Sequence, residues 1–234
     1  MDSRTQTIDY IFPGMDSYIE GSERYTWEYN RLIHSLKIMQ NEKLHIFITG
    51  TYECEKSEAL SYLVSRNSKT SIMNSETISA NVFQTDHLCL WMLPNLGKSE
   101  TPLCDQQAKY IFTHLENVHS NLFIILIILS TRRFGISYEQ AFIKSLRESF
   151  KNTEYFDHHF FDHHLIIAFR EESSKKIEFE RFKNESREAF RNNLSLYPEI
   201  IAFDLQQSDS SLYLSLKKKL LIRVAALYQE SLYL

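Results

Sequence analysis

Residues spaced for phosphate binding follow the first apolar run of the sequence. The run ends at Gly50, and the chain from there to Ser57 reads G-x-x-x-x-E-K-S. In a phosphate-binding loop, G-x-x-x-x-G-K-[ST], backbone N–H groups hold the phosphates, the lysine neutralises their charge, and the hydroxyl binds Mg²⁺. The stretch is therefore a candidate phosphate site with Ser57 as a weak metal ligand, and its members are Gly50, Thr51, Tyr52, Glu53, Cys54, Glu55, Lys56 and Ser57.

Glu55 stands where such a loop has its second glycine. A side chain there takes room that the phosphates need, and its charge repels them. Two like charges about 4 Å apart near a surface repel by roughly 4 kcal/mol at an effective dielectric of 20. Glu53 adds to the negative charge around Lys56. If both carboxylates turn toward solvent, weak phosphate binding survives, and if either faces the phosphate position, it does not. The alternative is that Lys56 and Ser57 simply begin an ordinary helix.

Composition limits the class of protein. The chain has 234 residues, 43% hydrophobic and 24% charged, which is enough for one sizeable core. A net charge of −4 excludes a general nucleic-acid binder. The longest apolar run, residues 122–129, is too short to span a bilayer. No signal peptide opens the sequence and the three cysteines lack metal-ligand spacing, so we expect reduced thiols in the cytoplasm.

Apolar strands alternate with amphipathic helices along the chain. This alternation predicts a doubly wound, mostly parallel α/β sheet, with residues 41–234 as its domain and residues 1–40 as an N-terminal extension. The expected strands are residues 44–49, 87–93, 122–129, 165–169 and 199–204. The expected helices are residues 25–40, 56–66, 106–118, 137–150 (with Ser137 and Gln140 as a capping box), 175–192 and 211–229. Residues 67–85 are expected to form a loop with an edge strand.

In such a sheet the ligand site lies at the carboxyl ends of the strands. The stretches that fall there are residues 50–57, 94–97, 169–173 and 204–206. Their convergence on one edge strengthens the phosphate-site interpretation.

The order of these stretches resembles that of a known family. Residues 44–228 are similar to the G domain of the GIMAP group, the immunity-associated GTPases. That family has a Walker A loop, then D-T-P-G-L, then a stretch containing G-R-[FY]-T-x-E, then T-R-x-[DE], and finally A-F-N-N. The corresponding stretches here, in the same order, are residues 50–57, WMLPNL at 91–96, SNLFIILIILSTRRFGISYEQ at 120–140, IAFREES at 167–173 and IIAFDL at 200–205.

The resemblance implies a P-loop NTPase (G-domain) architecture and GTP or GDP as cofactor. Its most family-specific piece is Arg133-Phe134 followed by Glu139-Gln140. It also implies assembly into homo-oligomers through the G domain and a peripheral place at a membrane.

Two departures concern catalysis. Met92 stands where the family has the aspartate that holds Mg²⁺ through water, and Asn95 stands where it has the glycine whose N–H meets the γ-phosphate. Mg²⁺ prefers hard oxygen ligands to a thioether. We therefore expect no catalytic residue, little or no hydrolysis, and little dependence on Mg²⁺. The hydroxyl of the first switch could come from Thr70, Ser75 or Thr77, and no pattern selects one.

The base-reading motif keeps more of its chemistry. By resemblance Arg170, Glu172 and Asp204 are the guanine-binding candidates, because a carboxylate at Glu172 could accept both guanine N–H groups. The alternative is that Glu172 belongs to a solvated loop.

Two other clusters have weaker claims. The doubled Asp-His-His at residues 157–164 could bind Zn²⁺ or Ni²⁺, but a surface loop before a strand is favoured. Lys217, Lys218 and Lys219 could touch anionic lipid, but the solvated face of a packed helix is favoured. That last helix should bury a stripe formed by Tyr213, Leu216, Leu220, Val224 and Leu227.

Two functional hypotheses follow. The first is a degenerate GIMAP-type G domain with weak guanine-nucleotide binding and a regulatory or assembly role. The second is a nucleotide-free pseudo-GTPase that binds a protein partner as a scaffold. On the first, Glu55→Gly should increase nucleotide affinity and Lys56→Ala should abolish the gain, with the fold tolerating both changes.

Overall fold

The computed structural model describes most of the region from residue 43 to residue 203. The described residues are 43–63, 69–74, 78–97, 103–120, 122–131, 136–152, 160–170, 176–196, 198, 200–203, 216, 219, 220, 222–224 and 227. The helix expected at residues 25–40 and the switch candidates Ser75 and Thr77 lie outside them. No helix among the described residues is both long enough and apolar enough to cross a membrane.

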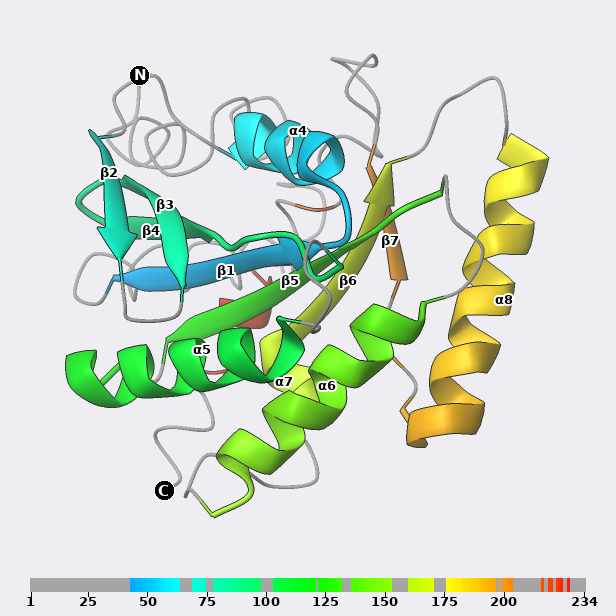
Figure 1. Cartoon of the computed structure of the whole chain (residues 1–234). Coiled ribbons are helices and arrows are strands. Elements are labelled where there is room, and N and C mark those ends of the chain that lie inside the picture. The colour runs from blue at the N-terminus through cyan, green and yellow to red at the C-terminus, as the bar shows by residue number, and fades with distance from the viewer. Residues whose placement is uncertain are drawn as a thin grey trace, which may run out of the picture.

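Seven strands form one sheet in the order β2-β3-β4-β1-β5-β6-β7 (Figure 1). The strands are β1 (Leu44–Gly50), β2 (Lys69–Asn74), β3 (Ser79–Gln84), β4 (Leu88–Met92), β5 (Phe123–Leu129), β6 (Leu165–Arg170) and β7 (Ile200–Phe203). The pairs from β4 through β1, β5 and β6 to β7 are parallel, while β2–β3 and β3–β4 are antiparallel. The predicted doubly wound, mostly parallel α/β sheet is confirmed.

The stretch expected to be a loop with an edge strand contains two strands, β2 and β3. In β3 the side chains of Ala80 and Val82 are buried and their neighbours are not, which is the period of a half-buried strand. All six residues of β2 are exposed. Thr70, the remaining switch candidate, lies on β2, at the edge of the sheet.

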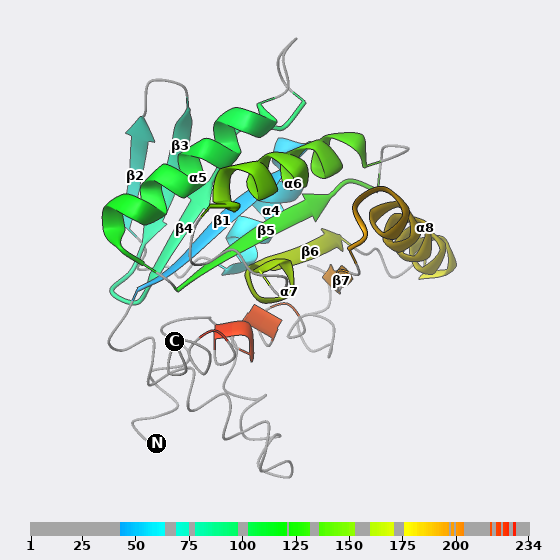
Figure 2. The ribbon, with the colours of Figure 1, turned by 90° about the horizontal axis from the view of Figure 1, so that it is seen from below.

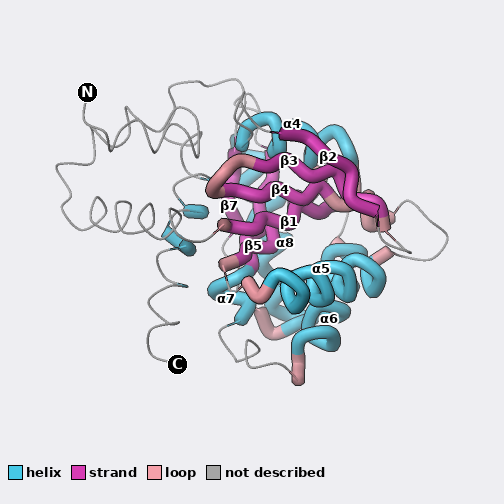
Figure 3. The backbone as a smooth tube through the Cα atoms, turned by 90° about the vertical axis from the view of Figure 1, so that its left-hand side faces the viewer, coloured by secondary structure: helices cyan, strands magenta, loops and turns pink. Residues whose placement is uncertain are grey.

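Helices cover both faces of the sheet. They are α4 (Glu53–Leu63), α5 (Cys104–Val118), α6 (Ser137–Phe150), α7 (Phe160–His164) and α8 (Lys176–Leu194). Figure 3 shows α4 on one side of the sheet and α5 and α6 on the other, and Figure 2 shows α8 beyond β7. Central strands point alternate residues to the two sides, so Ile46 packs with α4 while Phe47 packs with α5. The α4 side also contains four residues of the expected C-terminal stripe, Leu216, Leu220, Val224 and Leu227; Tyr213 lies outside the described residues.

Two local predictions are wrong. Helix α6 spans the expected residues, but Ser137 is its first residue rather than its N-cap, and the N-cap Ile136 makes no side-chain capping bond. Gln140 instead donates a hydrogen bond to the carbonyl of Ala189 at 3.0 Å, so it joins α6 to α8.

The second error concerns the doubled Asp-His-His. Its second half is helix α7 rather than a surface loop, because Phe160 and His164 are buried against β5. The imidazole of His164 stacks on the ring of Phe123 with centroids 3.9 Å apart. Among the described residues, no group of three or more His, Cys, Asp or Glu side chains could hold a metal ion; Asp157, His158 and His159 lie outside them.

Candidate functional site

The carboxyl ends of β1 and β5 form the topological switch point of the sheet. From β1 the chain continues to strands on one side, and from β5 it continues to strands on the other, and open α/β sheets bind ligands at such a point. Gly50 is the last residue of β1, and a Cβ atom there would lie 2.5 Å from the carbonyl oxygen of Ile128 on β5. Close packing of the two strands thus requires a glycine here without any ligand.

Helix α4 begins three residues earlier than the sequence predicts. It starts at Glu53 instead of Lys56, so only Thr51 and Tyr52 separate it from β1. The backbone N–H of Lys56 donates to the carbonyl of Tyr52 at 3.4 Å, within the first helical turn. Glu53 and Glu55 lie in that turn, where carboxylates interact favourably with the positive end of the helix dipole. The second half of the predicted phosphate loop is therefore helix.

The carboxylate of Glu55 turns into the protein. Its side chain is 4% exposed, and Oε1 accepts a hydrogen bond of 3.0 Å from the hydroxyl of Ser130, directly after β5. The sequence left open whether this carboxylate faces solvent or the position where phosphates would bind. It lies at the switch point itself, where phosphates would have to approach.

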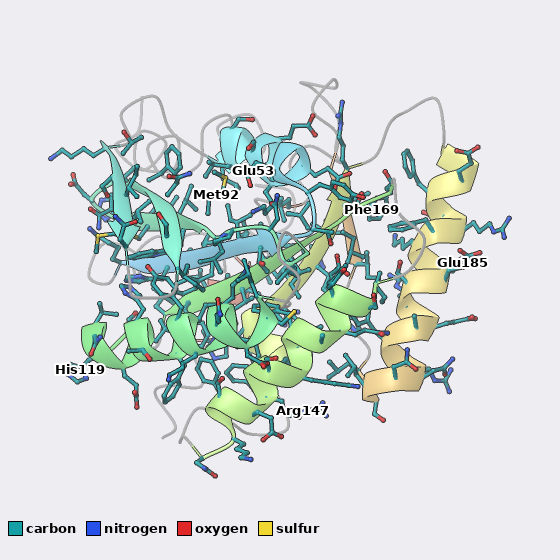
Figure 4. The ribbon with its side chains drawn as sticks, viewed as in Figure 1. Glu53, Met92, His119, Arg147, Phe169 and Glu185 are labelled. Carbon is teal, nitrogen blue, oxygen red and sulfur yellow. The ribbon has the colours of Figure 1, made fainter. Side chains whose placement is uncertain are left out.

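Lys56 is fully buried and engaged within the chain. Its ammonium donates to the carbonyl oxygen of Leu93, which follows β4, and lies 3.2 Å from Oε2 of Glu53. Figure 4 shows Glu53 on α4 above the sheet. The charge that would neutralise phosphates is thus already matched by groups of the protein.

The two residues expected around Mg²⁺ do meet. Oγ of Ser57 lies 4.0 Å from Sδ of Met92, which is labelled on the α4 side in Figure 4. The side chain of Met92 is only 9% exposed and belongs to the apolar cluster beneath α4. One hydroxyl beside a thioether does not fit the oxygen ligands that Mg²⁺ requires. The arrangement thus does not fit a resident magnesium ion.

The segment after β4 is tied to β1 by its backbone. The N–H groups of Leu93 and Leu96 donate to the carbonyls of Ile48 and Gly50, each at 3.0 Å. Asn95, between them, has a buried Oδ1 with no hydrogen-bond partner among the described residues. The segment that senses the γ-phosphate in the resembling family is here anchored by internal bonds.

Two buried polar residues hold this region in a way that sequence reasoning did not foresee, although Glu139 belonged to the stretch that carries the family resemblance. Gln107 of α5 accepts a hydrogen bond of 2.7 Å from Oγ1 of Thr49 and donates one of 2.9 Å to the carbonyl of Pro94. Glu139 of α6, only 1% exposed, accepts a hydrogen bond from the hydroxyl of Thr51. Each lies on the apolar face of its helix, and a polar residue on such a face was the available signal.

The guanine-binding candidates are only partly described. Arg170, at the end of β6, donates from Nη1 to Oε1 of Glu58 on α4 at 2.7 Å. Arg170 Nε and Glu58 Oε2 are buried and have no hydrogen-bond partner among the described residues. Glu172 and Asp204 lie outside those residues, so their guanine-binding role stays a prediction.

A different polar cluster lies near the amino end of β1, under α5. Nδ1 of His45 accepts a hydrogen bond of 3.3 Å from Nε1 of Trp91, whose ring centroid lies 4.1 Å from that of His114. Burial lowers the pKa of His45 to about 4, assisted by repulsion from His114 and Lys43. Burial also lowers the pKa of His114. Both imidazoles are therefore neutral at pH 7.

Comparisons with known proteins give matches only among solved structures. No protein-family model and no curated protein matches the chain. The G domain of the T. maritima FeoB iron transporter is similar at 12% identity and a TM-score of 0.42, over 79% of this chain and 99% of that one. An ADP-ribosylation-factor-like GTP-binding protein, the small COPII coat GTPase SAR1 from Encephalitozoon cuniculi in complex with GDP, is similar at 8% identity and a TM-score of 0.49, over 92% of each chain. The first is described as a G domain and the second as a small GTPase, and neither description mentions the GIMAP group.

Proposed function

We propose that this chain is a degenerate G domain that works as a protein-interaction module without GTP turnover. The observation that carries the proposal is the switch point itself. Lys56 and Glu55 are buried there and bonded to Leu93 and Ser130, which follow β4 and β5. Side chains of the protein occupy the place where a nucleotide would hold these segments together.

Loss of hydrolysis follows from the metal position. Phosphoryl transfer depends on Mg²⁺ and on a residue that positions the attacking water. At the place expected for Mg²⁺, Ser57 supplies one hydroxyl and Met92 supplies a thioether. GTP hydrolysis should therefore be indistinguishable from background.

Weak guanine-nucleotide binding is the second candidate, and the exposed Ser57 at the amino end of α4 favours it. A nucleotide would have to take Lys56 away from Leu93 and turn Glu55 out of the interior. Both changes cost free energy, so we expect any binding to be weak, similar for GDP and GTP, and independent of Mg²⁺. GIMAP kinship, an N-terminal extension at residues 1–40 and a cytoplasmic, membrane-peripheral place belong to this proposal.

Calorimetry with GDP and GTP, with and without Mg²⁺, tests the proposal. Wild-type protein should show no binding tighter than about 100 μM, which corresponds to roughly −5.5 kcal/mol. Glu55→Gly is the informative variant, because it removes the buried carboxylate; the double variant Glu55→Gly/Lys56→Ala should cancel any gain in affinity. Lys151→Ala, on the exposed end of α6, is the matched control for loss of a lysine. Tight, Mg²⁺-dependent binding with a preference for GTP would overturn the proposal.

A further inference from the structure

The outer strand of the sheet offers a full-length pairing edge. β2 is the terminal strand of the described sheet, and it pairs with β3 along its whole length, from Lys69 opposite Gln84 to Asn74 opposite Ser79 (Figure 1). The register is continuous, so no bulge interrupts it. The N–H and C=O groups on the outer side of a regular edge strand are a template for another extended chain.

The side chains on both faces of β2 are also exposed to solvent. Ile72 is 65% exposed and is the most exposed large apolar side chain that the structure describes, and Met73 is 47% exposed. Successive residues of a strand point to opposite faces, so each face of β2 presents one of these apolar groups. The adjacent strand β3 buries Ala80 and Val82, so the exposure of apolar side chains begins at β2 itself.

β2 also lacks the usual protection of an edge. Monomeric proteins blunt edge strands with charges, proline or bulges. The six residues of β2 include no proline and a single charge, that of Lys69 at its first position. The partner that fits this edge is an extended, uncharged strand with apolar side chains.

We propose that this partner is β2 of a second copy, paired antiparallel across a two-fold axis at Ile72. The two Ile72 side chains would lie opposite each other, and Thr70 would lie opposite Asn74. Lys69 of each copy would lie at opposite ends of the ladder, whereas parallel pairing would bring the two lysines together. A two-fold contact uses the same patch on both copies and therefore closes as a dimer. The inference rests on the proposed function, since it names the partner of the interaction module.

Analytical ultracentrifugation of the full chain over a concentration series tests the dimer. An edge contact of this length is small, so we expect a dissociation constant on the order of 10–100 μM. Ile72→Lys places two like charges opposite each other and should weaken the dimer at least about tenfold. The matched control is Val118→Lys, because Val118 is 42% exposed at the end of α5 and is not part of the pairing strand. A monomer at every concentration, or a dimer that Ile72→Lys leaves unchanged, would overturn the proposal.

Oxidative crosslinking supplies a second measurement that does not depend on tolerating a lysine. Ile72→Cys should form a disulfide-linked dimer, and Val118→Cys should crosslink no more than wild type. The native thiols of Cys89 and Cys104 are buried, and the wild-type protein reports any crosslinking through Cys54. Crosslinking at residue 118 but not at residue 72 would contradict the β2 contact. Nucleotide calorimetry on the same protein is independent of these results, so a failure of the dimer and a failure of the nucleotide-free proposal are distinguishable.

Discussion

The two ends of β1 bury polar side chains in opposite ways. At the carboxyl end, Lys56 and Glu55 are bonded to Leu93 and Ser130, groups that follow two different strands. At the amino end, His45 accepts a hydrogen bond from Trp91, and aromatic rings surround it. In the first region, hydrogen bonds join α4 to the segments after β4 and β5, and we call these hydrogen bonds ties. The second region is a packed cluster of neutral rings.

Because of this difference, the stability of the protein should depend on different perturbations at the two ends of β1. Cutting one tie leaves a buried partner without its hydrogen bond, which costs about 1–3 kcal/mol for each orphaned group. A cluster of neutral imidazoles instead resists protonation, because charging a buried ring requires desolvating the charge. The carboxyl end should therefore respond to substitution, and the amino end to pH.

The largest effect is expected for Lys56→Ala. The change removes a fully buried side chain and leaves the carbonyl of Leu93 without this donor, so it should cost about 2–5 kcal/mol. This burial replaces the expectation from the sequence that the fold tolerates the change freely. Lys56→Met keeps the aliphatic stem and should cost less. Urea denaturation measures both free energies of unfolding. A cost below about 0.5 kcal/mol for Lys56→Ala, similar to that of an exposed lysine, would show that the carboxyl end is not held by this tie.

Acid should act next most strongly, and at the amino end. Because the pKa of His45 falls from 6.5 to about 4 on folding, the unfolded chain binds a proton between these values and the native protein does not. Stability is therefore complete above pH 6.5 and is lost as the pH falls toward 4, by about 3 kcal/mol in total from this group.

The comparison of interest is with His45→Asn, whose amide oxygen can still accept from Trp91 but does not titrate. We expect wild type to lose about 3 kcal/mol of its free energy of unfolding between pH 7 and pH 4 because of His45. The variant should keep most of that free energy. Equal pH slopes in the two proteins would mean that the buried imidazole does not control acid stability.

Much of the fold could be predicted because the central strands are apolar on both faces. Phe123–Leu129 is buried at all seven positions, as a strand inside a parallel sheet must be. The predictions failed where tertiary packing decides the conformation. Phe160–His164 becomes helical because Phe160 and His164 fill space against β5, and the exposed strand β2 shows no hydrophobic period.

The place of the candidate phosphate stretch in the fold could be predicted from the sequence, but its contacts could not. Gly50 ends β1 and Lys56 and Ser57 follow it in α4, whereas their role in phosphate binding stays a prediction. The motif also suggested a loop, whereas Glu53 and Glu55 favour an earlier helix start. Which way Glu55 turns depends on Ser130, a contact across 75 positions of the chain that no local pattern reveals.

The smallest effect is expected for Glu58→Gln, which tests whether ion pairs add to the ties at the carboxyl end. Oε1 of Glu58 accepts from Arg170 at 2.7 Å, and the two side chains are 29% and 21% exposed. Glutamine can still accept that hydrogen bond, so only the charge is lost, and the cost should be at most about 1 kcal/mol and should shrink in high salt. Chemical denaturation by urea at two salt concentrations separates the charge from the hydrogen bond. A salt-independent loss of several kcal/mol would instead mark the pair as desolvated, and it would place a third strand, β6, among those that α4 holds together.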